Sequence, residues 1–181
     1  LRLLQGDVGS GKTVVALLAM AEVVEAGAQA ALMAPTELLA RQHFATVSKL
    51  SEGSGLRIAL LTGSDKGGAR MKLLADLAEG EIDILVGTHA LFQEDVGFKD
   101  LALAVVDEQH RFGVHQRIAL TGKGAATDIL VMTATPIPRT LVLTYFGDMD
   151  VSQLTEQPAG RRPITTTSVS LERLDEVVGR T

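Results

Sequence analysis

The sequence carries a glycine-rich segment in which a lysine and a threonine follow closely spaced glycines. Its residues are Gly6, Asp7, Val8, Gly9, Ser10, Gly11, Lys12 and Thr13. The glycines let the backbone curl so that its N–H groups point at phosphate oxygens, and a following helix adds its free N–H groups and dipole. Lys12 can reach the β- and γ-phosphates, and the Thr13 hydroxyl can ligate Mg²⁺. The segment therefore predicts a binding site for a nucleoside triphosphate such as ATP.

The alternative interpretation of this segment is a glycine-rich turn with a surface lysine. The flanking residues argue against it, because an apolar strand-like run precedes the glycines and an amphipathic helical pattern follows them. The apolar residues that recur at helical spacing are Val14, Leu17, Leu18, Ala21 and Val24. Gly27 can then close the helix.

Two adjacent acidic residues, Asp107 and Glu108, end an apolar run a hundred residues later. In a nucleotide hydrolase the first carboxylate holds Mg²⁺, usually through water, and the second polarises the attacking water. An acidic pair at a strand end is by itself most often only solvated. Its position after a phosphate-binding loop in the same chain favours a catalytic role for both residues.

Strand-like and helical patterns alternate along the chain and must position these residues. We expect strands near residues 2–5, 29–33, 57–61, 82–86, 101–106, 128–132 and 149–153, and helices near 12–26, 37–51, 67–78, 114–119 and 138–146. Continuously apolar strands imply a mainly parallel sheet covered on both faces, which is an α/β three-layer sandwich. Ligands of such sheets gather at the carboxyl ends of strands, where the glycine-rich segment and the acidic pair both fall.

Composition and charge narrow the classes of function. Hydrophobic residues make up 46% of the 181 residues and aromatic residues only 3%, which argues against base-stacking platforms. Cysteine is absent, which excludes disulfides and fits a reducing, cytoplasmic location. The net charge of −5 argues mildly against a bulk electrostatic grip on DNA but leaves room for local phosphate contacts. No apolar run is long enough to span a bilayer, so we expect no membrane partner.

The four histidines could in principle bind a metal. They are His43, His89, His110 and His115. Their spacing is not that of a zinc site, and we expect no structural metal.

The composition changes after residue 154, where two prolines and one glycine occur between residues 155 and 163. We interpret residues 1–155 as one domain, 156–163 as a linker and 164–181 as the truncated start of a second domain. The last segment contains a strand pattern at 164–169 and a helix pattern at 171–178. We expect it to be disordered, or to dock on the domain or on a neighbouring molecule.

Six short motifs resemble those of superfamily 2 helicases and occur in the same order. They are residues 6–13, 34–40, 62–64, 87–89, 107–110 and 133–136. The resemblance implies a P-loop NTPase domain of the RecA-like kind, with ATP and Mg²⁺ as cofactors and DNA as a partner. Longer strings at 87–93, 107–117 and 132–141 closely resemble the RecG family of ATP-dependent DNA helicases. The transcription-repair coupling translocases are similar, but they usually have Glu where this chain has Gln109.

The resemblance also implies roles for further residues. Contacts with the DNA backbone fall on Pro35, Thr36, Thr62, Gly63, Thr88 and His89. Coupling of hydrolysis to strand movement falls on Thr133, Thr135 and Gln109, with His110 as a relay beside the acidic pair. Local alternatives stay open, because Thr133 and Thr135 can simply cap the next helix and His110 can begin one. Thr36 can be only an N-cap, for a helix that carries Leu39, His43, Val47 and Leu50 on one face.

The sequence thus predicts the motor domain of an ATP-dependent DNA helicase that remodels forked or branched DNA in recombination and repair. A second motor domain in cis would supply an arginine to the ATP site, so we expect this chain alone to hydrolyse ATP very slowly. Three other classes use the same loop: a protein remodeller, a small-molecule kinase and a non-hydrolysing module. The motif at residues 133–136 argues against the remodeller. The helicase-like motifs after the loop argue against the kinase, and Glu108 argues against the non-hydrolysing module.

Overall fold

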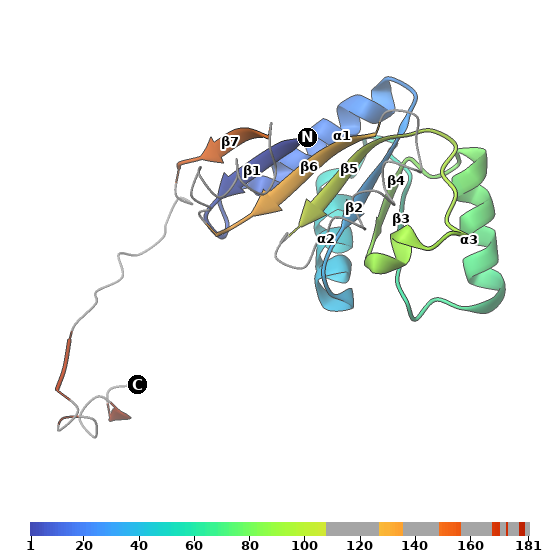
Figure 1. The fold of residues 1–181 in the computed structure, drawn as a ribbon. Coiled ribbons are helices and arrows are strands. Elements are labelled where there is room, and N and C mark those ends of the chain that lie inside the picture. Colours follow the sequence, from blue (N-terminus) through green and yellow to red (C-terminus); the bar gives the residue numbers. More distant parts are fainter. Residues whose placement is uncertain (108–126, 136–148, 157–167, 171–172, 174–177, 180–181) are drawn as a thin grey trace.

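The computed structural model describes residues 1–107, 127–135, 149–156, 168–170, 173 and 178–179. The strands are β1 (Arg2–Gly6), β2 (Gln29–Met33), β3 (Ile58–Leu61), β4 (Ile84–Gly87), β5 (Leu101–Asp107), β6 (Asp128–Thr133) and β7 (Asp150–Leu154). The helices are α1 (Lys12–Glu25), α2 (Glu37–Leu50), α3 (Gly67–Glu79) and the short 3₁₀ helix η1 (His89–Phe92). From β1 to β5 strands and helices alternate, as the sequence predicts, and the strands form one twisted sheet (Figure 1).

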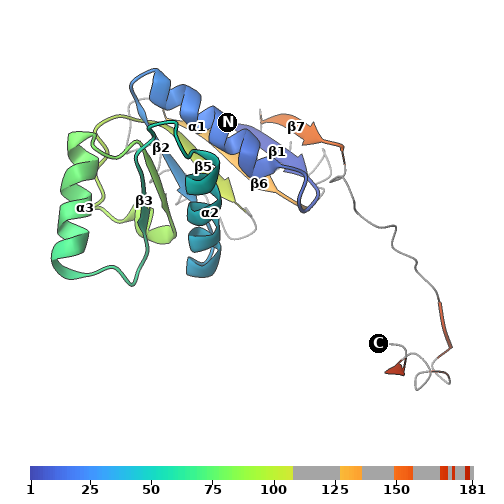
Figure 2. The same ribbon diagram turned by 180° about the vertical axis from the view of Figure 1, so that it is seen from behind.

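The described strands pair in parallel throughout, in the order β3-β4-β2-β5-β6-β1-β7. Helices α1 and α2 cover one face of the sheet (Figure 2). On that face Met20 and Val47 belong to one buried cluster with Leu32 of β2. Helix α3 and η1 cover the other face through Leu77 and Leu91. The predicted three-layer α/β sandwich is therefore confirmed, and all strands end at the same edge of the sheet.

The face that α1 turns toward the sheet differs from the predicted one. Leu17 and Val24 do pack on the core, but Val14 and Leu18 are exposed, and Met20 is fully buried in their place. The helix is apolar almost all round from residue 14 to residue 21, so periodicity alone could not select a face. The turn that precedes the helix sets its rotation instead.

Helix α2 begins as predicted, with Thr36 as its N-cap. The backbone N–H of Leu39 donates to Thr36 Oγ1 at 3.3 Å. Of the face expected from the spacing, Val47 is buried, whereas Leu50 is exposed because the helix ends there. Helix η1 was not predicted; the Thr88 hydroxyl caps it by accepting from the N–H of Ala90 at 3.4 Å.

Several predicted segments lie outside the described residues. These are the helices at 114–119 and 138–146 and most of the strand at 164–169 and of the helix at 171–178. Ser168 and Val169, which are described, are not in a strand. Across the part of the chain that the structure describes, no helix combines the length and apolar character needed to cross a membrane.

A buried glutamine joins three elements at the amino edge of the sheet. Gln29, only 5% exposed, donates through Nε2 to the carbonyls of Leu77 at 2.9 Å and Ile82 at 2.7 Å. Its Oε1 accepts from the backbone N–H groups of Lys99 at 2.8 Å and Asp100 at 3.1 Å. The amide therefore ties the end of α3 and the starts of β4 and β5 to β2.

Replacing Gln29 by leucine is expected to destabilise the domain by about 2–4 kcal/mol, because four backbone groups lose their partner. Urea unfolding followed by circular dichroism measures the change. The same substitution at Gln42, an exposed residue of α2, serves as the control and should be nearly neutral. A loss below about 1 kcal/mol at Gln29 would show that water replaces the amide at little cost.

Candidate active site

The glycine-rich segment forms a tight loop between β1 and α1. Gly9 has φ 79° and Gly11 has φ 92°, a left-handed conformation that side chains disfavour. The N–H of Ser10 donates to the carbonyl of Asp7 at 3.1 Å, which closes the turn. The loop curls over the first turn of α1, so the free N–H groups of that turn lie beside it.

Lys12 lies inside the curl of this loop. Its Nζ donates to the carbonyl of Gly6 at 2.8 Å and to that of Asp7 at 3.0 Å. The ammonium group is therefore at the mouth of the loop, where phosphate oxygens can replace the two carbonyls.

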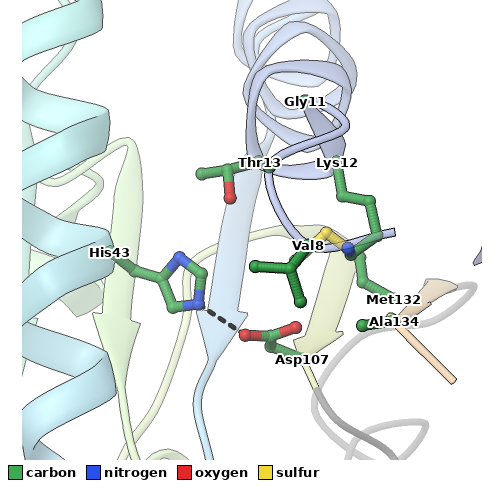
Figure 3. A pocket seen from close by; sticks show the side chains of 9 residues that line it. Val8, Gly11, Lys12, Thr13, His43, Asp107, Met132 and Ala134 are labelled. Atoms are coloured by element: carbon green, nitrogen blue, oxygen red, sulfur yellow. Dashed lines mark hydrogen bonds and ion pairs between the residues drawn. The ribbon is translucent and has the colours of Figure 1, made fainter. Parts of the chain in front are cut away.

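A cavity of about 300 Å³ opens beside the loop (Figure 3). Its lining comes from the glycine-rich loop, the start of α1, α2, β5, and the end of β6 with the turn after it. The lining residues are Val8, Gly9, Gly11, Lys12, Thr13, His43, Asp107, Met132 and Ala134. The structure thus brings Lys12, Thr13 and Asp107 together from distant parts of the sequence.

The polar groups of this cavity fit a nucleotide with a divalent cation. Lys12 offers a positive charge for phosphate oxygens, and Thr13 and Asp107 offer a hydroxyl and a carboxylate oxygen. Hard cations such as Mg²⁺ prefer oxygen ligands and bind to one or two protein groups together with substrate phosphates. The residue types present therefore suit Mg²⁺ with a triphosphate.

His43, on α2, belongs to the cavity although sequence reasoning did not place it there. Its Nε2 lies 2.6 Å from Oδ2 of Asp107, and each of the two side chains is 12% exposed (Figure 3). An ionised carboxylate can only accept, so the imidazole N–H donates this hydrogen bond. One feature of the sequence could have indicated it: His43 is a polar residue between Leu39 and Val47 on the helix face expected to pack on the sheet.

The end of β6 lies beside the acidic residue of β5. Thr133 is fully buried, and its hydroxyl accepts from the N–H of Thr135 at 3.1 Å. Gln5 of β1 donates through Nε2 to the carbonyl of Thr135 at 3.2 Å and accepts from Gln153 Nε2 at 2.8 Å. The hydroxyl of Thr133 thus serves the turn after β6, whereas the helix that it was expected to cap lies outside the described residues. Glu108, Gln109 and His110 lie outside the described residues.

The residues expected to contact DNA follow β2, β3 and β4, which are neighbours in the sheet. They differ in accessibility. Thr36, Gly63 and His89 are exposed and Pro35 is half-buried, whereas Thr62 and Thr88 are buried. The Thr62 hydroxyl donates to Asp65 Oδ2 at 2.9 Å, so it serves its own loop, as the Thr88 hydroxyl serves η1.

Glu37 fastens the first turn of α2 to the loop after β3. It accepts from Arg41 at 2.7 Å and from the Ser64 hydroxyl at 3.0 Å. The hydrogen bond from Arg41, and after it the one from Ser64, holds the pKa of the Glu37 carboxyl below its usual value. The negative charge is thus kept at the helix N-terminus, where the helix dipole favours it.

The class of protein follows from a match to a known family. Residues 2–143 match the family described as DEAD/DEAH box helicase. With its parallel sheet, phosphate-binding loop and acidic strand end, the chain belongs to the DEAD/DEAH box helicase family.

Within this class the chain is similar to ATP-dependent DNA helicase RecG. It is 57% identical over 177 residues to RecG of Bacillus subtilis (strain 168), covering 98% of this chain and 26% of that protein. It is 53% identical over 184 residues to RecG of Pasteurella multocida (strain Pm70), covering 99% and 27%. The resemblance expected from the sequence is confirmed, and the chain spans about a quarter of the length of these relatives.

Solved structures give the same result for the fold. A structure of RecG bound to a three-way DNA junction superposes with a TM-score of 0.85 and 47% identity, covering 99% of this chain and 24% of that one. A hypothetical ATP-dependent RNA helicase from Sulfolobus tokodaii gives a TM-score of 0.63 at 17% identity, covering 84% and 47%. The second likeness concerns the fold alone. Together they confirm the expected RecA-like architecture.

Proposed function

We propose that this chain is the first motor domain of an ATP-dependent DNA helicase that remodels forked or branched DNA. The observation that carries the proposal is the cavity in which Lys12, Thr13 and Asp107 meet, in a chain 53–57% identical to RecG helicases. The same identities favour this function over that of a transcription-repair coupling translocase. The proposal includes the bacterial cytoplasm as the location, because the DNA substrate lies there.

In the proposed reaction the chain's residues bind and orient the triphosphate. Lys12 exchanges the carbonyls of Gly6 and Asp7 for phosphate oxygens, and the loop N–H groups bind further oxygens. Thr13 and Asp107 would hold Mg²⁺, which draws charge from the phosphates during transfer. Glu108 would orient the attacking water.

We further propose that the carboxyl edge of the sheet is divided between two ligands. The ends of β1, β5 and β6 serve the nucleotide, whereas the loops after β2, β4 and β3 serve the DNA backbone. Thr36, Gly63 and His89 are the exposed groups available to phosphates there. Thr62 and Thr88, being buried, would act by shaping the loops that present backbone N–H groups.

The proposal includes a second motor domain. We assign residues 1–155 to the first domain, 156–163 to a linker and 164–181 to the start of the second. The relatives are about four times as long as this chain, which leaves room for the further domain. Gln109, Thr133 and Thr135 would couple hydrolysis to movement between the domains, with His110 as the relay.

An ATPase assay on the full-length protein, with and without forked DNA, tests this function. We expect DNA to stimulate hydrolysis. Replacing Glu108 by glutamine should lower the rate by about 10²–10⁴-fold while nucleotide binding is kept, because only activation of the water is lost. Hydrolysis without any response to DNA would favour a protein remodeller instead.

A further inference from the structure

The hydrogen bond between His43 and Asp107 joins the two halves of the carboxyl edge. His43 comes from α2, which follows β2, and Asp107 ends β5. Strands β2 and β5 are neighbours in the sheet, at the boundary between the proposed DNA half and the nucleotide half. The bond is short, at 2.6 Å, and both side chains are largely buried, so the bond depends strongly on where α2 lies.

Helix α2 reaches from one half of the edge to the other. Its N-cap, Thr36, is exposed on the DNA half, and His43 follows seven residues later, about two turns along the same helix. The first turn is also fastened to the loop after β3 through the bond from Ser64 to Glu37, and Arg41 of the same helix donates to that carboxylate as well. A phosphate bound at this end would therefore displace or fix the helix as one body.

The contacts of helix α2 with the buried cluster on its side of the sheet are apolar. Ala40 and Val47 are its fully buried residues, and Phe44 packs partly on the cluster around Met20. Contacts of this apolar kind tolerate small sliding movements better than a hydrogen bond of 2.6 Å does. A shift of about 1 Å would leave the packing in place and break the bond to Asp107.

We infer that His43 is a positioning residue that transmits DNA binding at α2 to the Asp107 carboxylate. This inference rests on the proposed function. DNA on the N-terminal end of α2 sets the position of His43, and His43 sets the orientation of the carboxylate that holds Mg²⁺ with the triphosphate. Because such coupling is reciprocal, nucleotide at the cavity must change DNA affinity by the same factor as DNA changes nucleotide affinity.

The test compares His43→Leu, which removes the donor, with His43→Gln, whose amide N–H has a similar reach. The affinity of the full-length protein for a forked oligonucleotide is measured by fluorescence anisotropy, with and without a non-hydrolysable ATP analogue and Mg²⁺. We expect the DNA affinity of the wild type to change by about 5- to 150-fold when the nucleotide analogue is added. His43→Leu should bring this factor close to 1, and His43→Gln should restore a large part of it.

Two further measurements separate coupling from a simple structural role. The ratio of ATPase rates with and without DNA should fall in His43→Leu and recover in His43→Gln. Gln42→Leu, which changes the adjacent exposed residue of the same helix, should keep the wild-type factor. Thermal unfolding of each variant reports whether α2 stays docked.

The outcomes distinguish this inference from the proposed function. A wild type whose DNA and nucleotide affinities are independent would overturn this inference, whereas the proposed function fails if forked DNA does not stimulate ATP hydrolysis. A coupled wild type together with a His43→Leu variant that keeps the full factor would overturn the role of His43 alone. Equal loss of coupling in the leucine and glutamine variants, accompanied by a lower unfolding temperature, would overturn the inference. His43 would then serve only to hold α2 in place.

Discussion

Replacing Lys12 by alanine is expected to lower ATP hydrolysis by about 10³-fold or more and to weaken nucleotide binding. The ammonium group is held at the mouth of the loop by the carbonyls of Gly6 and Asp7, so it is already placed for phosphate oxygens. Removal of a single preorganised donor to transition-state charge costs about 10²–10³ in rate, and Lys12 also carries a full charge. Steady-state ATPase assays of the full-length protein with forked DNA, and titration of it with a fluorescent nucleotide, measure the two effects.

The control for this experiment is Lys72→Ala. Lys72 is an exposed residue of α3 and does not line the cavity, so its loss should leave both measurements unchanged. Circular dichroism should show the same fold for both variants, because the Lys12 side chain is not part of the core. A Lys12→Ala variant that keeps a tenth of the wild-type rate would contradict the assignment of this loop.

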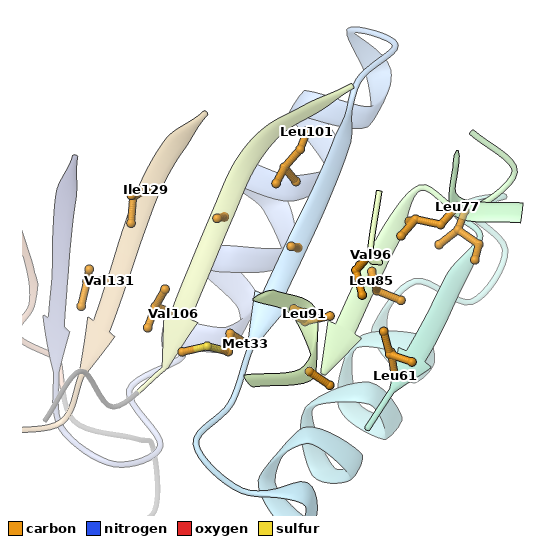
Figure 4. Packing of buried hydrophobic residues seen from close by; sticks show 14 of the residues in the cluster. Met33, Leu61, Leu77, Leu85, Leu91, Val96, Leu101, Val106, Ile129 and Val131 are labelled. Atoms are coloured by element: carbon orange, nitrogen blue, oxygen red, sulfur yellow. The ribbon is translucent and has the colours of Figure 1, made fainter. Parts of the chain in front are cut away.

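Replacing Gly87 by alanine is expected to destabilise the domain by about 2–4 kcal/mol. Gly87 ends β4, where a Cβ atom would overlap the carbonyl oxygen of Leu61 on β3 and lie 2.9 Å from Cδ2 of Leu91. Both leucines belong to the buried cluster on the α3 side of the sheet (Figure 4). The added methyl group must disturb either the pairing of β3 with β4 or the packing of Leu91, and both changes lower the free energy of unfolding. Urea unfolding of the 181-residue chain measures this decrease.

Gly68→Ala is the matched control for this substitution. Gly68 lies in the first turn of α3, and a Cβ atom there would meet nothing within 4 Å. Alanine should be neutral or slightly stabilising at this helical position. If both variants unfold at the wild-type urea concentration, the close approach of β3 and β4 at Gly87 is not needed.

Much of the fold could be predicted because it depends on short-range patterns. The bounds of β2 are those expected, since apolar residues 30–33 stand between a glycine-ended helix and a proline. The N-cap of α2 followed from one threonine before a helical pattern. The buried face of α1 could not be chosen, because apolar residues surround that helix and only the loop geometry fixes its rotation.

The candidate site could likewise be predicted in part. Lys12, Thr13 and Asp107 were identified because fixed spacing and strand ends carry their chemistry, and they do share one cavity. His43 could not be found this way, since its partner is 64 residues away and no local pattern links them. The burial of Thr62 was equally hidden, because it depends on how Asp65 folds back on the loop.

The amino edge of the sheet offers a place to label the protein without touching its chemistry. Gln29 and the groups it binds lie there, whereas every candidate ligand-binding residue among those described lies at the opposite edge. The turn after α2 contains the exposed residues Glu52 and Gly53, on the way from that helix to the start of β3. Because this sequence has no cysteine of its own, Glu52→Cys would give a single thiol in this segment. A fluorophore attached there could follow the motion of α2 from its far end.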